Sequence, residues 1–158
     1  MSLYPIFSPP AAPTYEYFRL TFTAGSTNIR ITEAEFLVGT TAYPTSNMTG
    51  NSAPSPLVAS SDREDNVPSC FRAFDGSTDG DYFFQSSQVT CFLQLFLGSG
   101  NGIAATSLKI VGGNTTARSP TAFTLKVSNT GSYGGEEVTL LSVSGLSWSG
   151  NETKTWAL

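Results

Sequence analysis

The sequence predicts an all-β fold, a sandwich of about eight short strands, from three observations. Segments that alternate apolar and polar residues recur along the chain and are separated by turns rich in Gly, Asn, Ser and Pro. Charged residues make up only 13% of the chain, whereas Ser, Thr, Gly, Asn and Pro are abundant, which is typical of β proteins. No stretch repeats its apolar residues with a helical period. At 158 residues, the chain is expected to form one domain.

The first residues differ in composition from the rest of the chain. Residues 1–13 contain four prolines and no regular period, so they are expected to form an extended arm, with the sandwich spanning residues 14–158. The arm contains no basic residue, and its prolines interrupt any apolar run, so it is not expected to be a secretory signal.

The first two expected strands differ in the regularity of their pattern. Phe18, Leu20 and Phe22 alternate with polar residues, which indicates a half-buried strand. In the next strand, which begins at Ile29, the apolar residues change parity, so one face stays buried only if a bulge lies near Thr32-Glu33. A bulge would direct Glu33 toward a site; alternatively, Glu33 lines the solvent face.

The later strands follow a long connection. Residues 39–69 are polar with scattered apolar anchors, and a loop of this length is usually functional or wrapped on the surface. The strand at 91–97 is apolar on both faces, so it is expected to be central and covered on each side. Further strands are expected at 107–111, at 123–127, at 138–143 and in a hairpin-like segment bracketed by Trp148 and Trp156.

Composition also excludes several classes of function. The net charge of −4 and the eight dispersed Lys and Arg residues argue against a nucleic-acid partner. The chain has no His, which removes the commonest general base and the commonest transition-metal ligand. The longest apolar run, 91–97, is too short to span a membrane.

Cys70 and Cys91 either form one disulfide or are two buried thiols.

The segment 72–83, Arg-Ala-Phe-Asp-Gly-Ser-Thr-Asp-Gly-Asp-Tyr-Phe, concentrates oxygen-bearing side chains in one turn. Its three carboxylates, two hydroxyls and two glycines suit a hard cation such as Ca²⁺, which binds six to eight oxygen ligands. Alternatively, the segment is a solvated turn, because Asp, Gly and Ser dominate turns for conformational reasons.

Several of these segments, taken together, resemble the discoidin or coagulation-factor C-type domain. The resemblance is carried by Tyr-Phe-Arg-Leu at 17–20, Ile-Thr-Glu-Ala-Glu-Phe at 31–36, Ala-Phe-Asp-Gly at 73–76, Phe-Leu-Gln-Leu-Phe-Leu-Gly at 92–98, and Ser-Pro-Thr-Ala-Phe-Thr-Leu at 119–125 running into Ser-Asn-Thr-Gly at 128–131. It implies a galactose-binding-like β-sandwich of jelly-roll type, in a group that includes the family 32 carbohydrate-binding modules. Here the Arg-Leu and Ile-x-Glu strands come first rather than last, so the chain looks circularly permuted, in a form similar to modules of phage tail and virion-surface proteins.

The resemblance implies a structural Ca²⁺ site and a sugar site on the loops. The implied metal ligands are the carbonyls of Thr32 and Arg72 and the side chains of Glu33, Asp75, Ser77 and Asp81. The loop is one residue longer than the family pattern, and Asp81 stands where Thr is common. The candidates for sugar contact are Arg63, Tyr82, Asn114, Arg118 and, in addition, Tyr133; each is otherwise an exposed loop residue. The absence of His argues against a galactose-type site.

These observations lead to one expected function and one alternative. The chain is expected to be a non-catalytic, extracellular or virion-surface adhesion module, a phage tail or capsid component that binds host surface polysaccharide or other glycans. The alternative is a decoration or spacer protein that docks on other virion proteins through residues 1–13, and homo-oligomers are left open. A hydrolase built on paired carboxylates is a third hypothesis, but the clustered carboxylates have a simpler explanation as ion ligands or solvated loop.

Overall fold

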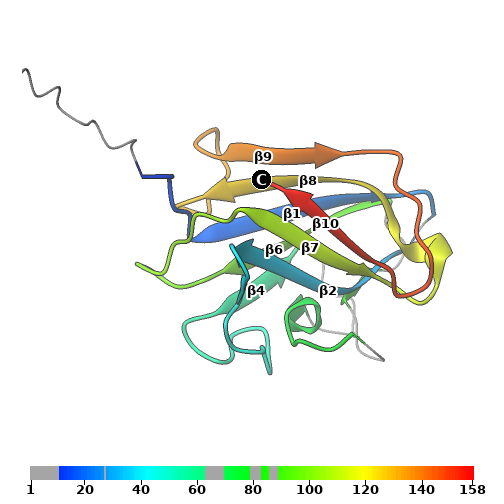
Figure 1. Ribbon diagram of the computed structural model, residues 1–158, viewed down its shortest axis with the longest axis horizontal. Helices are drawn as coiled ribbons and strands as arrows, with labels where there is room; N and C mark the ends of the chain where they lie inside the picture. Colours follow the sequence, from blue (N-terminus) through cyan, green and yellow to red (C-terminus); the bar gives the residue numbers. More distant parts are fainter. Residues whose placement is uncertain (1–10, 27, 63–69, 79–82, 86–88) are drawn as a thin grey trace, which may run out of the picture.

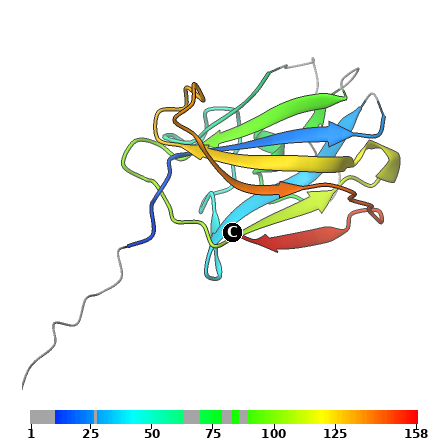
Figure 2. The same cartoon turned by 90° about the horizontal axis from the view of Figure 1, so that it is seen from above.

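The structure, a computed structural model, describes residues 11–26, 28–62, 70–78, 83–85 and 89–158, with only the backbone for 84 and 85. Its ten strands form two antiparallel sheets, so the predicted all-β sandwich is confirmed (Figure 1). Figure 2 shows the two sheets as separate layers, with β6, β1, β8 and β9 in one layer and β7 and β10 in the other.

The first sheet is organised around β1 at its centre. Its strand order is β4 (Val58–Ser61), β6 (Thr90–Phe96), β1 (Tyr17–Ala24), β8 (Pro120–Ser128) and β9 (Val138–Val143). Tyr17 pairs with Phe96 on one side and with Ser128 on the other, so strands that are far apart in the sequence lie side by side in this sheet.

The second sheet is organised around β2, the longest strand. Its order is β10 (Thr153–Ala157), β7 (Ser107–Gly112), β2 (Ile29–Val38) and β3 (Thr41–Tyr43), and β5 (Phe83–Gln85) also pairs with β2. Ile31 pairs with both β7 and β5, and Phe36 with both β7 and β3. The short strands β3 and β5 therefore share one edge of β2, opposite β7. Two 3₁₀ turns, η1 (Cys70–Ala73) and η2 (Thr116–Arg118), are the only helical segments within the described residues.

The core lies between the sheets and follows from the alternating pattern of β1. Phe18, Leu20 and Phe22 are fully buried, and the ring of Phe18 lies 4.5 Å from that of Phe36 in the opposite sheet. Each such side chain contributes about 1.5–3 kcal/mol by leaving water. Trp148 and Trp156 are half-buried and pack against this core.

Three details differ from the sequence-based expectations. The connection 39–69 includes two strands, β3 and β4, that its irregular pattern does not indicate. The segment bracketed by Trp148 and Trp156 is not a hairpin, because it contributes a single strand, β10, which pairs with β7. The outer residues of β6, Phe92 and Phe96, are half-buried rather than covered by another layer, and the Phe96 ring stacks on the Tyr17 ring at 4.3 Å.

The two cysteines are not joined in a disulfide. Cys70 in η1 and Cys91 in β6 are both buried, which agrees with the alternative of two buried thiols.

The loops gather at two opposite ends of the sandwich. Residues 113–119 and 144–152 lie together at the right-hand end of Figure 1. At the other end, Tyr15 pairs with Ile103 and the backbone N–H of Leu158 donates to the carbonyl of Thr106. Most of the predicted arm, residues 1–10, lies outside the described residues. None of the helical turns described here is long enough to cross a bilayer.

Candidate cation site and ligand pocket

The predicted bulge in β2 is present. Ile31 pairs with Gly112 of β7 and Glu33 pairs with Val111, so Thr32 is the extra residue between them. The Thr32 side chain is buried, and its hydroxyl donates a hydrogen bond of 3.0 Å to the carbonyl oxygen of Gly112. The bulge turns Glu33 away from solvent, because this residue is only 2% exposed.

The buried Glu33 side chain contacts the acidic turn, which is about forty residues away in the sequence. Its Oε2 atom accepts a 3.0 Å hydrogen bond from the backbone N–H of Gly76. Next to it, Asp75 is half-buried, and its Oδ1 accepts a 2.8 Å hydrogen bond from the backbone N–H of Ser77. The bulged strand and the acidic turn therefore meet through the Glu33 carboxyl and the backbone of Gly76, the residue after Asp75.

The electrostatics of this contact are unfavourable to two negative charges. The pKa of Glu33 is raised to about 9. Burial is the main cause, and the neighbouring charge of Asp75 acts in the same direction. The Gly76 N–H and Lys109 act in the opposite direction, but Lys109 forms its 2.6 Å ion pair with Glu35. At neutral pH the Glu33 carboxyl is neutral unless a positive charge joins it.

The residues present fit a hard cation. The donors that meet here are oxygens, which Ca²⁺ prefers, and a divalent ion would allow both carboxylates to ionise. The described part of the chain contains no group of three or more Asp, Glu, His or Cys side chains that could hold a metal. Two predicted ligands, Arg72 and Ser77, lie on the same turn as Asp75, whereas Asp81 lies outside the described residues.

The acidic turn also holds a neighbouring loop, residues 44–57. The backbone N–H of Met48 donates to the carbonyl of Phe74 at 2.9 Å, and the side-chain oxygen of Asn51 accepts a 3.1 Å hydrogen bond from the N–H of Phe71. Asn47 packs so closely on Gly76 that a Cβ atom there would overlap with it. The shape of this loop therefore depends on the position of the turn.

The structure describes three of the predicted sugar contacts, Asn114, Arg118 and Tyr133, and Tyr133 lies on the loop between β8 and β9, apart from the other two. Asn114 and Arg118 lie exposed on the loop between β7 and β8, near the end of the sandwich opposite Tyr15. The side-chain oxygen of Asn114 accepts a hydrogen bond from its neighbour Thr115. Arg63 and Tyr82 lie outside the described residues.

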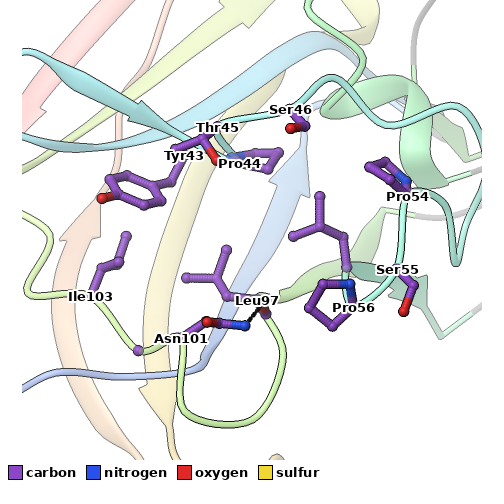
Figure 3. Close-up of a pocket in the computed structure, with 12 residues that line it drawn as sticks. Tyr43, Pro44, Thr45, Ser46, Pro54, Ser55, Pro56, Leu97, Asn101 and Ile103 are labelled. Atoms are coloured by element: carbon purple, nitrogen blue, oxygen red, sulfur yellow. Dashed lines mark hydrogen bonds between the residues drawn. The ribbon is translucent and has the colours of Figure 1, made fainter.

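A better-formed hollow of about 400 Å³ lies elsewhere, between loop 44–57, the preceding Tyr43 and residues 97–103 (Figure 3). It is lined by Tyr43, Pro44, Thr45, Ser46, Pro54, Ser55, Pro56, Leu57, Leu97, Asn101, Gly102 and Ile103. The ring of Tyr43 lies beside Ile103, and Leu97 and Asn101 lie across the hollow from Pro44 (Figure 3). We call this hollow the proline pocket.

The proline pocket combines an apolar floor with a polar rim. Leu57, Leu97 and Ile103 are buried, with exposed fractions of 9% or less. The rim consists of the hydroxyls of Thr45, Ser46 and Ser55 and the side-chain amide of Asn101. The Asn101 amide donates a hydrogen bond of 3.2 Å to the carbonyl oxygen of Leu97. Such a combination suits a small ligand with one apolar face and several hydroxyls.

Sequence reasoning missed this pocket, although a signal was present. The three prolines that line it belong to the long polar connection 39–69, whose length alone pointed to a functional loop. Nothing in the local pattern brings that loop beside residues 97–103.

The comparisons with known proteins add no identification. Neither a family model nor a curated protein nor a solved structure matches this chain. The resemblance to discoidin domains therefore stays a prediction.

Proposed function

We propose that this protein is a non-catalytic carbohydrate-binding module whose ligand loop is positioned by a structural Ca²⁺ ion. The contact between loop 44–57 and the acidic turn supports this proposal most directly. The turn contacts Glu33 through the Gly76 N–H, and it also contacts Asn47 and Met48, which directly follow Ser46 of the proline pocket in the sequence. An ion bound by Glu33 and Asp75 would fix the turn, and through it one wall of the pocket.

The ligand proposed for the pocket is a single sugar ring at a chain end or branch. A pyranose has an apolar C–H face and a rim of hydroxyls, which complement the buried floor and the polar rim of the proline pocket. The three prolines of loop 44–57 that line the pocket limit backbone freedom, so less conformational entropy is lost on binding. As in the resemblance, the proposed setting is a phage particle that recognises a host surface glycan.

A glycan array and host-cell binding, each measured in CaCl₂ and in EDTA, test the proposal. Asn101→Ala removes the rim amide and should weaken binding at least fivefold, the order expected for one lost hydrogen bond at about 1 kcal/mol. Asn129→Ala is the matched control, because the Asn129 amide also ties backbone segments together, through Thr14 and Glu16, but lies outside the pocket. Binding that is equal in both variants and indifferent to calcium argues against the proposal.

The second candidate is the spacer or decoration protein that docks through its arm. One observation favours it: Ala12 and Pro13 lie beside Tyr15 and Leu158, so both described ends of the chain leave the sandwich on the same side. No glycan binding in either buffer, together with incorporation into particles that depends on residues 1–13, would favour this candidate.

A further inference from the structure

The outer face of the first sheet carries an arginine whose charge is not matched by a carboxylate of the described residues. Arg19 of β1 stands between Gln94 of β6 and Lys126 of β8 in the strand register. Lys126 forms a 3.0 Å ion pair with Glu137. The described part of the chain offers no such pair to Arg19, whose Nε and Nη2 atoms donate to Oε1 of Gln94 at 3.0 and 2.8 Å. Because an amide oxygen is neutral, the positive charge of Arg19 has no counter-charge on this face.

Two aromatic rings and Gln94 leave one edge of the Arg19 guanidinium uncovered. Its carbon lies 3.7 Å from the ring centroid of Tyr133 and 4.3 Å from that of Phe92, so the rings cover the planar faces. A guanidinium has five N–H donors in one plane, and Gln94 accepts from only two of them. The remaining edge, between Nη1 and Nη2, presents two parallel N–H groups, which match the two oxygens of a carboxylate.

Tyr133 is held beside Arg19 by a strained loop. Its φ is +48°, in the left-handed region that costs a residue other than glycine about 1–2 kcal/mol. Oε1 of Glu136 accepts hydrogen bonds from the hydroxyls of Ser128 and Thr130, at 2.7 and 2.6 Å, and from the backbone N–H of Tyr133 at 3.2 Å. Strained residues that their surroundings hold in place are common at binding sites. Because the guanidinium is fixed in advance, little freedom is lost when a ligand binds to it.

Arg19 lines a hollow whose other residues offer hydroxyl groups and one ion pair. The hollow has a volume of about 330 Å³ and is lined by Arg19, Thr21, Thr124, Lys126, Tyr133 and Glu137. A second hollow, of about 300 Å³, shares Thr21 and Thr124 with it and adds the hydroxyls of Thr23, Ser142 and Ser144. None of these residues lines the proline pocket.

The charges around the first hollow favour a ligand with a single negative charge. Arg19 and Lys126 are positive and Glu137 is negative, so the lining carries one net positive charge on a chain whose net charge is −4. A polyanion such as a nucleic acid would be repelled by the rest of this surface. A neutral ligand would exclude water from Arg19 without matching its charge. A lone carboxylate matches both the charge and the parallel N–H groups.

The hydroxyls beside Arg19 indicate what carries the carboxylate. Thr21 and Thr124 stand next to Arg19 and Lys126 along β1 and β8, on the same face of the sheet. A hydroxyl both donates and accepts hydrogen bonds, so these two side chains suit the hydroxyl groups of a sugar ring. An acidic peptide would bring a carboxylate but few such groups.

We propose that this hollow binds the carboxylate of an acidic sugar, such as a uronate, through the Nη1–Nη2 edge of Arg19, with Thr21 and Thr124 contacting hydroxyls of the same ring. The inference rests on the proposed function in its ligand class and deepens it, because it makes a sugar acid part of the glycan that the module recognises. The site lies on the face of a sheet, apart from the loops that form the proline pocket.

Trigalacturonate is the probe, titrated in EDTA into the isotope-labelled protein and followed by NMR, which also reports the Nε–H signal of Arg19. The methyl ester of the same trisaccharide is the matched neutral probe, because it has the same rings without the charges. We expect trigalacturonate to shift the Arg19 signal and the ester to bind at least about tenfold more weakly. Equal binding of the two probes, or shifts that spare Arg19, would overturn the inference.

Charge variants on this face should change the affinity in opposite directions. Arg19→Met should weaken the binding of trigalacturonate at least about tenfold, and Arg19→Lys, which keeps the charge but not the parallel N–H groups, should weaken it about fivefold. Glu137→Gln removes a repelling charge and should strengthen binding about two- to fivefold, a gain that misfolding cannot produce. The matched controls, Lys154→Met and Glu152→Gln, make the same changes in net charge at the 2.6 Å ion pair beside β10. If each control changes the affinity as much as its partner variant, the overall charge explains the binding and the inference fails.

A short peptide of glutamates separates a sugar acid from a carboxylate on a protein. We expect it to bind at least about tenfold more weakly than trigalacturonate, because it offers few hydroxyls to the threonines. Thr21→Val should weaken the binding of trigalacturonate about fivefold and leave that of the peptide unchanged. Equal affinity for the peptide and the sugar would overturn the sugar as the ligand.

The outcomes also distinguish this inference from the proposed function. Binding at Arg19 should depend neither on calcium nor on Asn101, which lines only the proline pocket. If trigalacturonate does not bind while other glycans bind in a manner that needs calcium and Asn101, the proposed function stands and this inference fails. If trigalacturonate binds through Arg19 and no glycan binding responds to calcium or to Asn101→Ala, the inference stands and the role of the pocket fails. No binding to any glycan overturns both.

Discussion

The carboxyl group of Glu33 provides the sharpest test of the cation site, because replacing it with the glutamine amide should have opposite effects on stability with and without calcium. Burial and the charge of Asp75 raise its folded-state pKa to about 9, against an ordinary value of 4.5. In EDTA the folded protein therefore holds a proton on Glu33 that the unfolded chain releases above pH 4.5. The free energy of unfolding should fall as the pH rises from 4.5 toward 9, by about 1.4 kcal/mol per pH unit.

The magnitude follows from this pH window. By pH 7 the loss amounts to about 3 kcal/mol relative to pH 4.5. Glu33→Gln has no proton to release, and its side-chain oxygen can still accept the hydrogen bond from Gly76. We therefore expect the variant to be more stable than the unchanged protein in EDTA at pH 7, by up to about 3 kcal/mol.

In calcium the order should reverse. A bound ion keeps Glu33 ionised, so the pH dependence above about pH 5 should disappear. Calcium at about one thousand times its dissociation constant should add about 4.1 kcal/mol, more than the difference of about 3 kcal/mol in EDTA. Glu33→Gln should lose this gain. Urea denaturation at pH 5, 7 and 9, in EDTA and in CaCl₂, measures all of these differences.

The matched control is Glu35→Gln, two residues along the same strand. Glu35 forms a partly exposed 2.6 Å ion pair with Lys109, so its loss should cost at most about 1 kcal/mol in either buffer. If the unchanged protein shows the same pH profile with and without calcium, or if Glu33→Gln is the less stable protein in EDTA, the reasoning about this site is wrong.

Two further predictions concern the proline pocket and the thiols. Gly98 has a φ of +96°, and a Cβ atom there would overlap Pro56, so Gly98→Ala should lower the free energy of unfolding by about 2–4 kcal/mol in urea denaturation. The control is Gly100→Ala, which should cost only about 1–2 kcal/mol because Gly100 has a φ of +78° but no atom within reach of an added Cβ. Equal losses in the two variants would contradict the predicted contact with Pro56. Cys70 and Cys91 are buried, and burial raises the pKa of the Cys91 thiol, so a thiol-specific reagent should react slowly with the folded protein and label both residues in denaturant without reductant. Labelling of neither in denaturant would instead indicate a disulfide.

The sequence predicted the parts of the molecule in which local pattern and burial agree. Phe18, Leu20 and Phe22 alternate and are buried in β1. The parity change after Ile31 could be reconciled with one buried face only by a bulge, which is why the position of Glu33 followed from the sequence. Where a pattern has a single physical solution, it predicts the structure well.

Features that depend on distant partners could not be predicted in this way. Alternation shows which face of a strand is buried but not which strand lies beside it. The segment bracketed by Trp148 and Trp156 was therefore expected to be hairpin-like, although its strand, β10, pairs with the distant β7. The proline pocket depends on loop 44–57 being held by Phe71 and Phe74, contacts that no local period reveals. Arg19, which the resemblance places in a strand motif, proved to lie between two rings.

The central position of β1 in its sheet has a consequence for how the protein is made. Among the strands described here β1 comes first in the sequence, yet its partners are β6 and β8, which end at Phe96 and Ser128. The apolar face of β1 therefore has no neighbouring strands until β6 and β8 have been synthesised, and during that time aggregation competes with folding. Refolding is accordingly expected on the millisecond-to-second scale of proteins dominated by non-local pairing.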